Sequence, residues 1–367
     1  MIKVGINGFG RIGRAIFRNN LEKKYFQVVA INDINPDNKN IVYTLNYDTL
    51  YDRLSTLFSV EGDYMVSTNG DKIKLSHHSS IDEVDWAALD VDFVIDASGV
   101  YKNVLNARNL IKNGTVQKVF ITHSPENVDF TMVLDANENL LDIDEHHVIS
   151  TSICDATAIA PVMKAIANNF GFEYGYATTL HPWLSYQNLI DGPASSWSVP
   201  GQIYHHFALG RSSIGNMIPK PTTAITATCK VLEAEGISEQ MIGSFSYRTP
   251  TAIVGSADIT LQLKKQVDIK EVIAMFDELE QTQGWHIIHN NWEPLVSLDF
   301  KKSDFSAVID HRWTDVIQGR MLKIVLWYDN EWGYSSRVLD QVKFVENKLI
   351  DKTKQEEQIV EKKFIKI

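Results

Sequence analysis

Cysteine is scarce in this chain, which has only Cys154 and Cys229 among its 367 residues. Two cysteines without a pairing framework exclude a disulfide scaffold and indicate a reducing compartment, so we expect a cytoplasmic protein. Long apolar runs are lacking too, since no stretch approaches the ~18 residues that span a bilayer. Met1-Ile2-Lys3 does not open a signal peptide. We therefore expect neither a membrane protein nor a secreted one.

Positive charge is in deficit, with 35 Lys and Arg against 46 Asp and Glu and a formal net charge of −11. No basic tract is present, so we expect no nucleic-acid partner. Adjacent histidine pairs lack the i, i+4 spacing that puts two metal ligands on one helix face, and we expect no metal site; these pairs are His77-His78, His146-His147 and His205-His206. The length and the 44% hydrophobic content are sufficient for two globular domains.

The N-terminus has the pattern of a dinucleotide-binding turn. An apolar strand over residues 3–7 precedes Gly8, Gly10 and Gly13, and a helix-like stretch over 15–21 follows. Gly8 would turn the chain, Gly10 would let the backbone approach a pyrophosphate, and Gly13 would let helix and strand pack closely. The helix N-terminus would then bind the phosphates. By itself, the glycine motif is also typical of an ordinary tight turn.

An acidic residue follows at the expected distance. A second strand over residues 27–32 ends in Asp33, 20 residues past Gly13, where the ribose-binding acid of such a site belongs. A carboxylate accepts hydrogen bonds from a ribose hydroxyl but repels a 2′-phosphate, and no Arg or Lys immediately follows Asp33. Strand, motif, helix, strand and acid together predict a Rossmann site that prefers NAD to NADP.

Cys154 and His181 are candidates for covalent chemistry. Cys154 precedes a helix-like run over residues 162–170, and His181 ends a strand-like run over 174–180. The positive end of a helix dipole favours a thiolate, and a histidine beside it could hold that thiolate as an ion pair and later move a proton. Spacing alone does not show that the two side chains touch. A buried cysteine and an unrelated histidine would give the same pattern.

Several longer motifs resemble the phosphorylating glyceraldehyde-3-phosphate dehydrogenase family over nearly the whole chain. They occur in the family's order: Asn7-Gly8-Phe9-Gly10-Arg11-Ile12-Gly13-Arg14, Asn32-Asp33, Tyr47-Asp48, Ala97-Ser98-Gly99-Val100-Tyr101, Asp191-Gly192-Pro193, Arg248-Thr249-Pro250-Thr251 and Trp327-Tyr328-Asp329-Asn330-Glu331-Trp332-Gly333-Tyr334-Ser335. The resemblance implies NAD-dependent oxidation of a small phosphorylated aldehyde through a thiohemiacetal and a thioacyl intermediate.

The fold expected is α/β, with an N-terminal Rossmann NAD-binding domain over residues 1–150 and an α+β catalytic domain over 151–332. Strand patterns in the second domain predict a mixed or antiparallel sheet backed by helices; they cover 174–180, 241–247, 253–264, 306–310 and 321–328. By resemblance, a helix over 333–350 returns to the first domain, a long loop over 195–219 lies at a subunit interface, and the protein is a homo-oligomer, a tetramer. For the charged tail, 351–367, we expect a solvated helix, with a partner-binding helix as the alternative.

The resemblance also assigns residues. It implies that Cys154 is the nucleophile, His181 the base, Asn330 the contact of the nicotinamide amide, and Arg248 the ligand of the substrate phosphate. The predicted cofactor-binding residues are Asn7, Gly8, Phe9, Gly10, Arg11, Ile12, Gly13, Asp33, Ser98, Gly99, Ser124, Asn330 and Tyr334. The predicted substrate-binding residues are Arg248, Thr222, Thr223, Lys220 and Tyr186.

The residues around the nucleophile depart from the family pattern. The family has Ser and Thr beside the cysteine, and both help to hold inorganic phosphate; here Ile153 and Asp155 take their places. A carboxylate ~4 Å from a dianion would repel it by ~1 kcal/mol per charge in water-like surroundings and ~4 kcal/mol at an effective dielectric of ~20. Asp155 should also raise the pKa of Cys154, unless it serves only the helix dipole. Lys220 adds a compensating cation, whereas Leu184 and Tyr186 replace hydroxyls expected near the substrate phosphate.

Two alternatives to the main interpretation stay open. One is a non-phosphorylating dehydrogenase of another anionic aldehyde, of the erythrose 4-phosphate kind, that releases a free acid. The other is an NAD-binding paralogue without catalysis, against which the intact Cys154, His181, Arg248 and Asn330 argue. The altered neighbours of Cys154 favour the first alternative over strict phosphate dependence.

Overall fold

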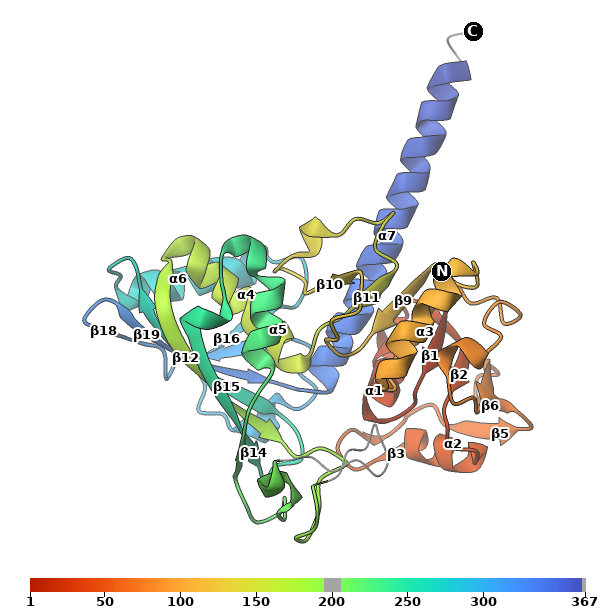
Figure 1. Cartoon of the computed structure of the whole chain (residues 1–367), viewed down its shortest axis with the longest axis horizontal. Coiled ribbons are helices and arrows are strands. Elements are labelled where there is room, and N and C mark those ends of the chain that lie inside the picture. Colours follow the sequence, from red (N-terminus) through yellow and green to blue (C-terminus); the bar gives the residue numbers. More distant parts are fainter. Residues whose placement is uncertain (195–205, 365–367) are drawn as a thin grey trace.

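The computed structural model describes residues 1–194 and 206–364, and the side chains of the last helix as far as residue 358. His205 and the first part of the predicted loop over 195–219 lie outside the described residues. Two lobes stand side by side, each built around one large β-sheet, and the chain's last helix, α7 (Trp332–Phe364), starts at their junction (Figure 1).

The N-terminal lobe is a doubly wound sheet, as predicted for a Rossmann domain. Its strand order within the described residues is β10-β11-β9-β8-β1-β2-β7-β6-β5. The central strands are parallel, and β1 lies between β2 and β8. The strands are β1 (Lys3–Asn7), β2 (Gln27–Asn32), β5 (Phe58–Glu61), β6 (Tyr64–Ser67), β7 (Lys72–Ser76), β8 (Phe93–Asp96), β9 (Lys118–Ile121), β10 (Phe130–Thr131) and β11 (Val148–Ser150). The lobe's helices are α1 (Arg11–Lys23), α2 (Asn38–Asn46) and α3 (Tyr101–Lys112), and β3 (Tyr47–Asp48) pairs with β4 (Asp52–Arg53) apart from the main sheet.

The turn between β1 and α1 depends on two glycines. Gly8 has φ +88°, and a Cβ there would lie 2.6 Å from the backbone of Ser98. A Cβ on Gly13 would lie 2.2 Å from the carbonyl oxygen of Gly8. Neither contact is possible for a larger residue, so the glycines permit the close packing of turn, helix and strand that the motif predicts.

The second lobe contains a mixed sheet, in agreement with the strand patterns. Its order is β13-β14-β12-β15-β19-β17-β16, with β18 paired to β19. Strand β12 runs parallel to β14 and antiparallel to β15. The strands are β12 (Phe172–Pro182), β13 (Ile218–Lys220), β14 (Ile242–Thr249), β15 (Gly255–Leu263), β16 (Ile288–Asn291), β17 (Ala307–Asp310), β18 (Asp315–Ile317) and β19 (Met321–Tyr328).

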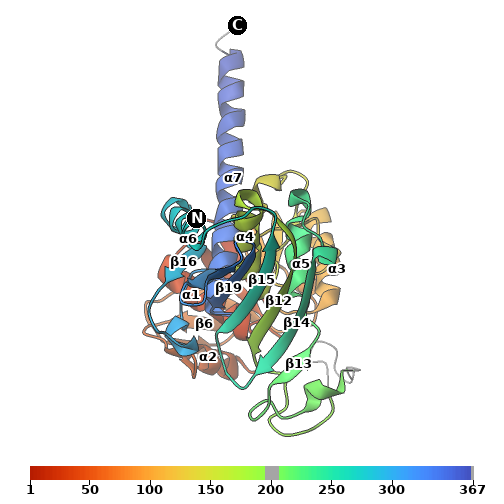
Figure 2. The same ribbon diagram turned by 90° about the vertical axis from the view of Figure 1, so that its left-hand side faces the viewer.

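Within the described ranges, helices cover one face of this second sheet. They are α4 (Cys154–Asn169), α5 (Ala224–Val231) and α6 (Ile269–Thr282). Figure 2 views the opposite face, where no described helix lies in front of β14, β12, β15 and β19. Alternation along β12 exposes Tyr174 and Tyr176 on this open face and buries Ala177, Thr179 and His181 on the other. His181 therefore points towards the helix layer.

Helix α4 begins earlier than the sequence pattern indicated. It starts at Cys154, eight residues before the predicted run over 162–170, and carries Pro161 in its interior. Proline lacks the N–H for a helical hydrogen bond and usually marks a helix start. Almost every side chain from Asp155 to Ile166 is buried, and this packing offsets the cost of the proline. Cys154 thus stands in the first turn itself.

The predicted loop over 195–219 is also interrupted in its described part. A short 3₁₀ helix, η3, forms over Phe207–Gly210, and β13 pairs with β14 from Ile218. Pro219 fits there because β13 is an edge strand. The other 3₁₀ helices are η1 (Ile81–Glu83), η2 (Glu138–Leu140), η4 (Glu233–Glu235), η5 (Glu239–Met241) and η6 (Ser297–Phe300).

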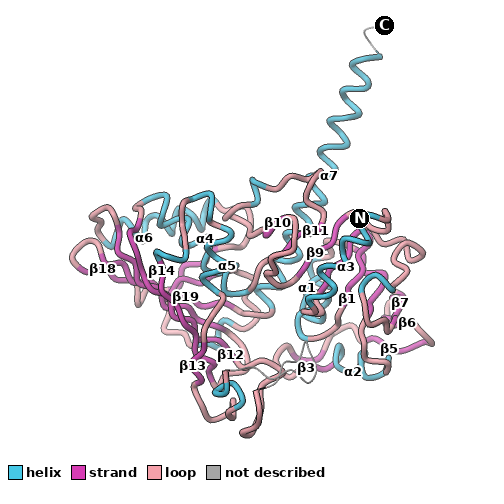
Figure 3. Tube along the Cα trace, viewed as in Figure 1, coloured by secondary structure: helices cyan, strands magenta, loops and turns pink. Residues whose placement is uncertain are grey.

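Helix α7 returns to the N-terminal lobe and then leaves it. Its first turns pack into that lobe's core through Tyr334, Val338, Leu339, Val342 and Val345. The rest projects away from both sheets, as the tube in Figure 3 shows. The predicted helix over 333–350 and the charged tail as far as Phe364 therefore form one helix of 33 residues. From Asp351 to residue 358 the described side chains are exposed except the half-buried Lys352, which pairs with Asp144.

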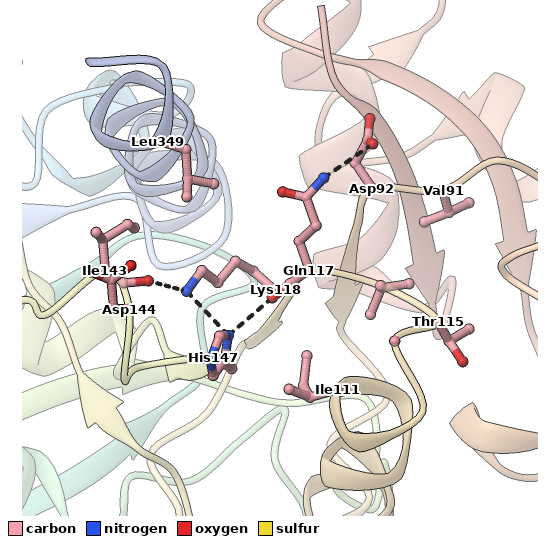
Figure 4. A pocket seen from close by; sticks show the side chains of 12 residues that line it. Val91, Asp92, Ile111, Thr115, Gln117, Lys118, Ile143, Asp144, His147 and Leu349 are labelled. Carbon is pink, nitrogen blue, oxygen red and sulfur yellow. Dashed lines mark hydrogen bonds between the residues drawn. The ribbon is translucent and has the colours of Figure 1, made fainter. Parts of the chain in front are cut away.

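A cavity of about 520 Å³ opens in the N-terminal lobe, next to α7, and none of the residues predicted to bind cofactor or substrate lines it (Figure 4). Lys118 reaches into it, but its Nζ donates to the carbonyl oxygens of Ile143 (2.5 Å) and His146 (2.8 Å). This lysine therefore holds the loop before β11. Among the described helices, none combines the length and the apolar character needed to cross a membrane.

Candidate active site

The predicted cofactor loops meet at one edge of the N-terminal sheet. Strands β9, β8, β1 and β2 are parallel neighbours, so the segments after their carboxyl ends lie together. These segments carry Ser124, Ser98-Gly99, Gly8 and Asp33. The chain passes from β1 to β2 on one side, and β8 lies on the other, which makes this edge a topological switch point where α/β sheets bind ligands.

The turn after β1 leaves space for a pyrophosphate. A Cβ on Gly10 would meet no atom within 4 Å. The first N–H groups of α1, at Arg11, Ile12 and Gly13, have no intrahelical partner, since the helical ladder begins with the Arg14 N–H and the Gly10 carbonyl. Unpaired N–H groups at a helix N-terminus suit phosphate oxygens.

Asp33 is held beside this turn. Its Oδ2 accepts a 2.6 Å hydrogen bond from the Phe9 N–H, and its Oδ1 accepts one of 2.9 Å from the Asn35 N–H. The side chain is only half-buried. The glycine turn and the acid therefore stand in the arrangement that a dinucleotide requires, and these residues fit NAD.

The side chains of three other predicted cofactor residues are engaged within the protein. The Asn7 amide donates to Asp96 over 2.8 Å. The Phe9 ring is buried in the core. The Arg11 guanidinium pairs with Glu331 just before α7, with an Nε–Oε1 distance of 3.0 Å. These side chains already have partners within the protein, and the Arg11 ion pair joins the glycine turn to the segment after β19.

Asn330 lies in the segment between β19 and α7, and Tyr334 lies in the first turn of α7. The Asn330 Oδ1 accepts a 3.1 Å hydrogen bond from the Val254 N–H, which fixes the orientation of the amide. Val254 has φ +70°, a strained conformation for a β-branched residue. The Tyr334 hydroxyl donates to the Ser152 carbonyl (3.0 Å) and bonds the Thr151 hydroxyl (2.8 Å). Tyr334 therefore fixes the chain that leads into the predicted nucleophile.

The structure brings Cys154 and His181 together. The Cys154 Sγ lies 3.6 Å from the His181 Nε2. The His181 Nδ1 lies 2.8 Å from the Pro182 carbonyl oxygen, and because a carbonyl only accepts, Nδ1 carries the proton and Nε2 is an acceptor. Burial, together with the nearby Arg248, lowers the pKa of His181 to about 4. The imidazole is thus neutral at pH 7 with Nε2 as a proton acceptor, and its lowered pKa makes it a weak base.

Asp155 affects the protonation state of Cys154. Its Oδ1 lies 3.9 Å from the Cys154 Sγ and accepts a 2.6 Å hydrogen bond from the Tyr328 hydroxyl. Burial raises the pKa of Cys154 well above its usual value, and the Asp155 carboxylate raises it further. The resting pair is therefore a thiol and a neutral imidazole instead of the ion pair that the helix dipole alone suggested. The expected effect of Asp155 on this pKa is confirmed in direction.

Tyr328 was not among the predicted site residues. Its ring stands opposite Gly255 on β15, where a Cβ would lie 2.8 Å from the tyrosine ring. Gly255 therefore makes room for the Tyr328 side chain. The partner, Asp155, is 173 residues away in the sequence. No local pattern could have revealed this pair, although Tyr328 lies within a recognised motif.

Two cations lie next to the Cys154–His181 pair. Arg248 on β14 is in register with His181 on β12, and both side chains are buried. The Arg248 Nε is buried without a hydrogen-bond partner in the described part of the chain. Burial, with Arg248 close by, lowers the pKa of Lys220 to about 8. An anion bound here would find an unpaired guanidinium donor.

The other three residues predicted to bind substrate are Thr222, Thr223 and Tyr186. The Thr222 hydroxyl accepts a 3.1 Å hydrogen bond from the Ala224 N–H at the start of α5. Thr223 is exposed, and Tyr186 is half-buried. Of the five residues predicted to bind substrate, the structure places Arg248 and Lys220 at the Cys154–His181 pair most plainly.

Comparison with known proteins agrees with this geometry. The family model described as "Glyceraldehyde 3-phosphate dehydrogenase, NAD binding domain" matches residues 2–104, and the one described as "Glyceraldehyde 3-phosphate dehydrogenase, C-terminal domain" matches residues 153–330. The chain is 34% identical over 348 residues to glyceraldehyde-3-phosphate dehydrogenase of Geobacillus stearothermophilus, covering 95% of this chain and 99% of that protein. It is 34% identical over 349 residues to the enzyme of the same name from Wickerhamomyces ciferrii, with the same coverage. The match to the family's NAD-binding domain identifies NAD as the cofactor.

Proposed function

The chain belongs to the glyceraldehyde-3-phosphate dehydrogenase family, and from that premise we propose that it oxidises a small phosphorylated aldehyde, with glyceraldehyde 3-phosphate as the first candidate. The observation that carries the proposal is the 3.6 Å contact between the Cys154 Sγ and the His181 Nε2. A nucleophile within reach of an oriented base is the arrangement that covalent catalysis requires.

The proposed reaction uses the two side chains in sequence. The Cys154 Sγ attacks the aldehyde carbon while the His181 Nε2 takes the thiol proton and passes it to the carbonyl oxygen, which gives a thiohemiacetal. Nε2 then accepts the hydroxyl proton as the carbon is oxidised, which leaves a thioacyl group on Sγ. Bound NAD supplies the hydride acceptor for this step. The Cys154 N–H, in the first turn of α4, would stabilise the oxyanion.

Other groups would position the cofactor and the substrate. The Asn330 amide, oriented by Val254, would hold the nicotinamide, while the N–H groups of α1 and the Asp33 carboxylate would hold the phosphates and the ribose. Arg248 would grip the anionic tail of the substrate with its unpaired Nε. A Michaelis complex would therefore extend from the first sheet to β14.

Release of the acyl group as a free acid is the second candidate function, a non-phosphorylating dehydrogenase of an anionic aldehyde such as erythrose 4-phosphate. Asp155 favours it, because a carboxylate 3.9 Å from the sulfur would lie close to a phosphate dianion that attacked the thioacyl carbon. Repulsion at that range is ~4 kcal/mol per charge at an effective dielectric of ~20. Lys220 opposes this effect, since it adds positive charge to the same site.

The expected assembly and location are parts of the proposal. The open face of the second sheet exposes Tyr174 and Tyr176, and an exposed aromatic pair on an uncovered sheet supports a homo-oligomer, in the family pattern a tetramer. Neither cysteine forms a disulfide, which supports a reducing, cytoplasmic setting.

A screen for NADH production tests the function. Purified protein with NAD would be offered phosphorylated and unphosphorylated small aldehydes, with and without inorganic phosphate. We expect turnover of a phosphorylated aldehyde by the unmodified protein and by Cys229→Ser, and none by Cys154→Ser. Equal turnover by Cys154→Ser, or no NADH with any aldehyde, would overturn the proposal.

A further inference from the structure

We propose that Cys154, Asp155 and His181 form a zinc site whose occupation blocks the nucleophile. The ligand atoms of these three residues all lie within 4.8 Å of one another. A thiolate, a carboxylate and an imidazole are the three ligand types that Zn²⁺ accepts in proteins. From the sequence we expected no metal site, because the histidine comes from a strand that only the fold brings to the start of α4.

The separations suit a tetrahedral ion. Zn–S bonds of ~2.3 Å and Zn–N bonds of ~2.0–2.1 Å place sulfur and nitrogen ~3.6 Å apart at a tetrahedral angle. The Cys154 Sγ and the His181 Nε2 are 3.6 Å apart. A Zn–O bond of ~2.0–2.2 Å requires a similar sulfur–oxygen separation, and the Asp155 Oδ1 lies 3.9 Å from Sγ. The His181 nitrogen and the Asp155 oxygen, which lie within 4.8 Å of each other, must approach to ~3.4 Å, so binding requires the carboxylate to move towards His181.

Two of the ligands already have outer partners that orient them. The Pro182 carbonyl holds the proton on the His181 Nδ1, so that Nε2 presents its lone pair. The Tyr328 hydroxyl donates to Asp155 and leaves that carboxylate further lone pairs for a metal. Such partners usually account for a ~10–100-fold difference in metal affinity.

The charge balance is favourable. Loss of the thiol proton gives a thiolate and, with the Asp155 carboxylate, two negative charges for one Zn²⁺; the proton goes to the solvent. Arg248 and Lys220 reduce the attraction, since both carry positive charge near His181. Asp155 supplies the third ligand at a position where the family pattern has a threonine. A water molecule would complete the tetrahedron.

The blocking effect follows from the sulfur's role. A sulfur bound to Zn²⁺ cannot attack an aldehyde, and an Nε2 bound to the ion cannot take a proton. This inhibition rests on the proposed function, whereas the binding rests on the geometry alone. Metal binding and aldehyde oxidation can therefore be tested separately.

Cobalt titration of the full-length protein, followed by displacement with Zn²⁺, tests the site. We expect one Co²⁺ per chain with a thiolate-to-cobalt charge-transfer band, kept in Cys229→Ser and lost in Cys154→Ser. Asp155→Asn and the milder Tyr328→Phe should each weaken Zn²⁺ binding by ~10-fold or more, with thermal unfolding as the check of folding. A band that survives in Cys154→Ser, or unchanged affinity in a folded Asp155→Asn protein, would overturn the proposal.

Inhibition by Zn²⁺ is tested separately, by the rate of NADH formation. Zn²⁺ should abolish NADH formation by the unmodified protein, and a chelator should restore it. Activity unaffected by Zn²⁺ at saturation would refute the block even if the metal binds. Failure of the metal-free protein to oxidise any aldehyde would count against the proposed function and leave the cobalt result standing.

Discussion

The Tyr328 hydroxyl donates a 2.6 Å hydrogen bond to the Asp155 carboxylate, which lies 3.9 Å from the Cys154 sulfur. The bond holds a negative charge next to the group that must lose a proton to react. The Cys154–His181 pair therefore rests in its neutral form, and its reactivity depends on the negative charge of Asp155.

Asp155→Asn keeps the size of the side chain and removes this charge. Because Asp155 and burial both raise the pKa of Cys154, the variant should lower that pKa. We expect alkylation of Cys154 by iodoacetamide to be faster at neutral pH and its pH profile to move to lower pH. The measurement is made in a Cys229→Ser background, so that one thiol reacts. A profile that stays in place would show that burial alone sets the reactivity.

Asp33→Gly should narrow the preference for NAD over NADP by ~1–3 kcal/mol, because it removes hydrogen bonds to the ribose and the repulsion of a 2′-phosphate. The ratio of kcat/KM for the two cofactors gives the change. Asp37→Asn is a matched control, since Asp37 caps α2 through Lys39 and Asn40. A wild-type protein that uses NADP as well as NAD would contradict the role of Asp33.

Asp96→Asn should change the pH dependence of stability. Burial raises the pKa of Asp96 from 3.8 to about 6, so the folded protein keeps a proton that the unfolded chain releases between pH ~4 and ~6. Stability is therefore greatest below pH ~4 with respect to this group and falls as pH rises to ~6, by ~3 kcal/mol in all. Asparagine does not ionise, so the Asp96→Asn variant does not lose this stability as pH rises.

The test compares urea unfolding of Asp96→Asn and the unmodified protein at pH 4 and pH 7.5. The variant should gain stability relative to the unmodified protein at the higher pH, because only the unmodified protein must keep a charge out of water there. The acceptor of the Asn7 hydrogen bond is retained in the variant. The same difference at both pH values would mean that Asp96 does not titrate as described.

The double change Ile153→Ser with Asp155→Thr tests the acyl acceptor. It restores two hydroxyls and removes one negative charge, so phosphate affinity should improve by several kcal/mol, from ~1.5–3 kcal/mol per hydrogen bond and ~1–4 kcal/mol from the charge. Product analysis over phosphate from absent to tens of millimolar should show mainly free acid with the unmodified protein and acyl phosphate with the variant. Ile153→Val is the control. No gain in the double variant would place phosphate elsewhere.

Local patterns predicted much of the fold. Strands β1, β2 and β19 have the predicted bounds, because each is an apolar run ended by a turn or a motif. The start of α4 was missed because Pro161 resembles a helix start, and β13 was missed because an edge strand of three residues has no detectable period. The expected helical tail follows α7 without a break as far as Phe364, because charged residues continue a helix as readily as apolar ones.

The site was predictable where a motif carried it. The glycine turn and Asp33 stand together as their spacing predicted, and Cys154 meets His181 as the resemblance implied. The contact of Tyr328 with Asp155 and the strained Val254 were not predictable, since the first joins residues far apart and the second depends on tertiary packing.

The most direct test of the account is mass spectrometry of the protein quenched during a burst with NAD and glyceraldehyde 3-phosphate in the absence of phosphate. The account predicts an acyl group on the peptide that contains Cys154, in amounts equal to the NADH formed in the first turnover. Cys229 should stay unmodified, and His181→Asn should form the adduct much more slowly. NADH formed at the normal rate without an adduct on Cys154 would contradict the covalent mechanism.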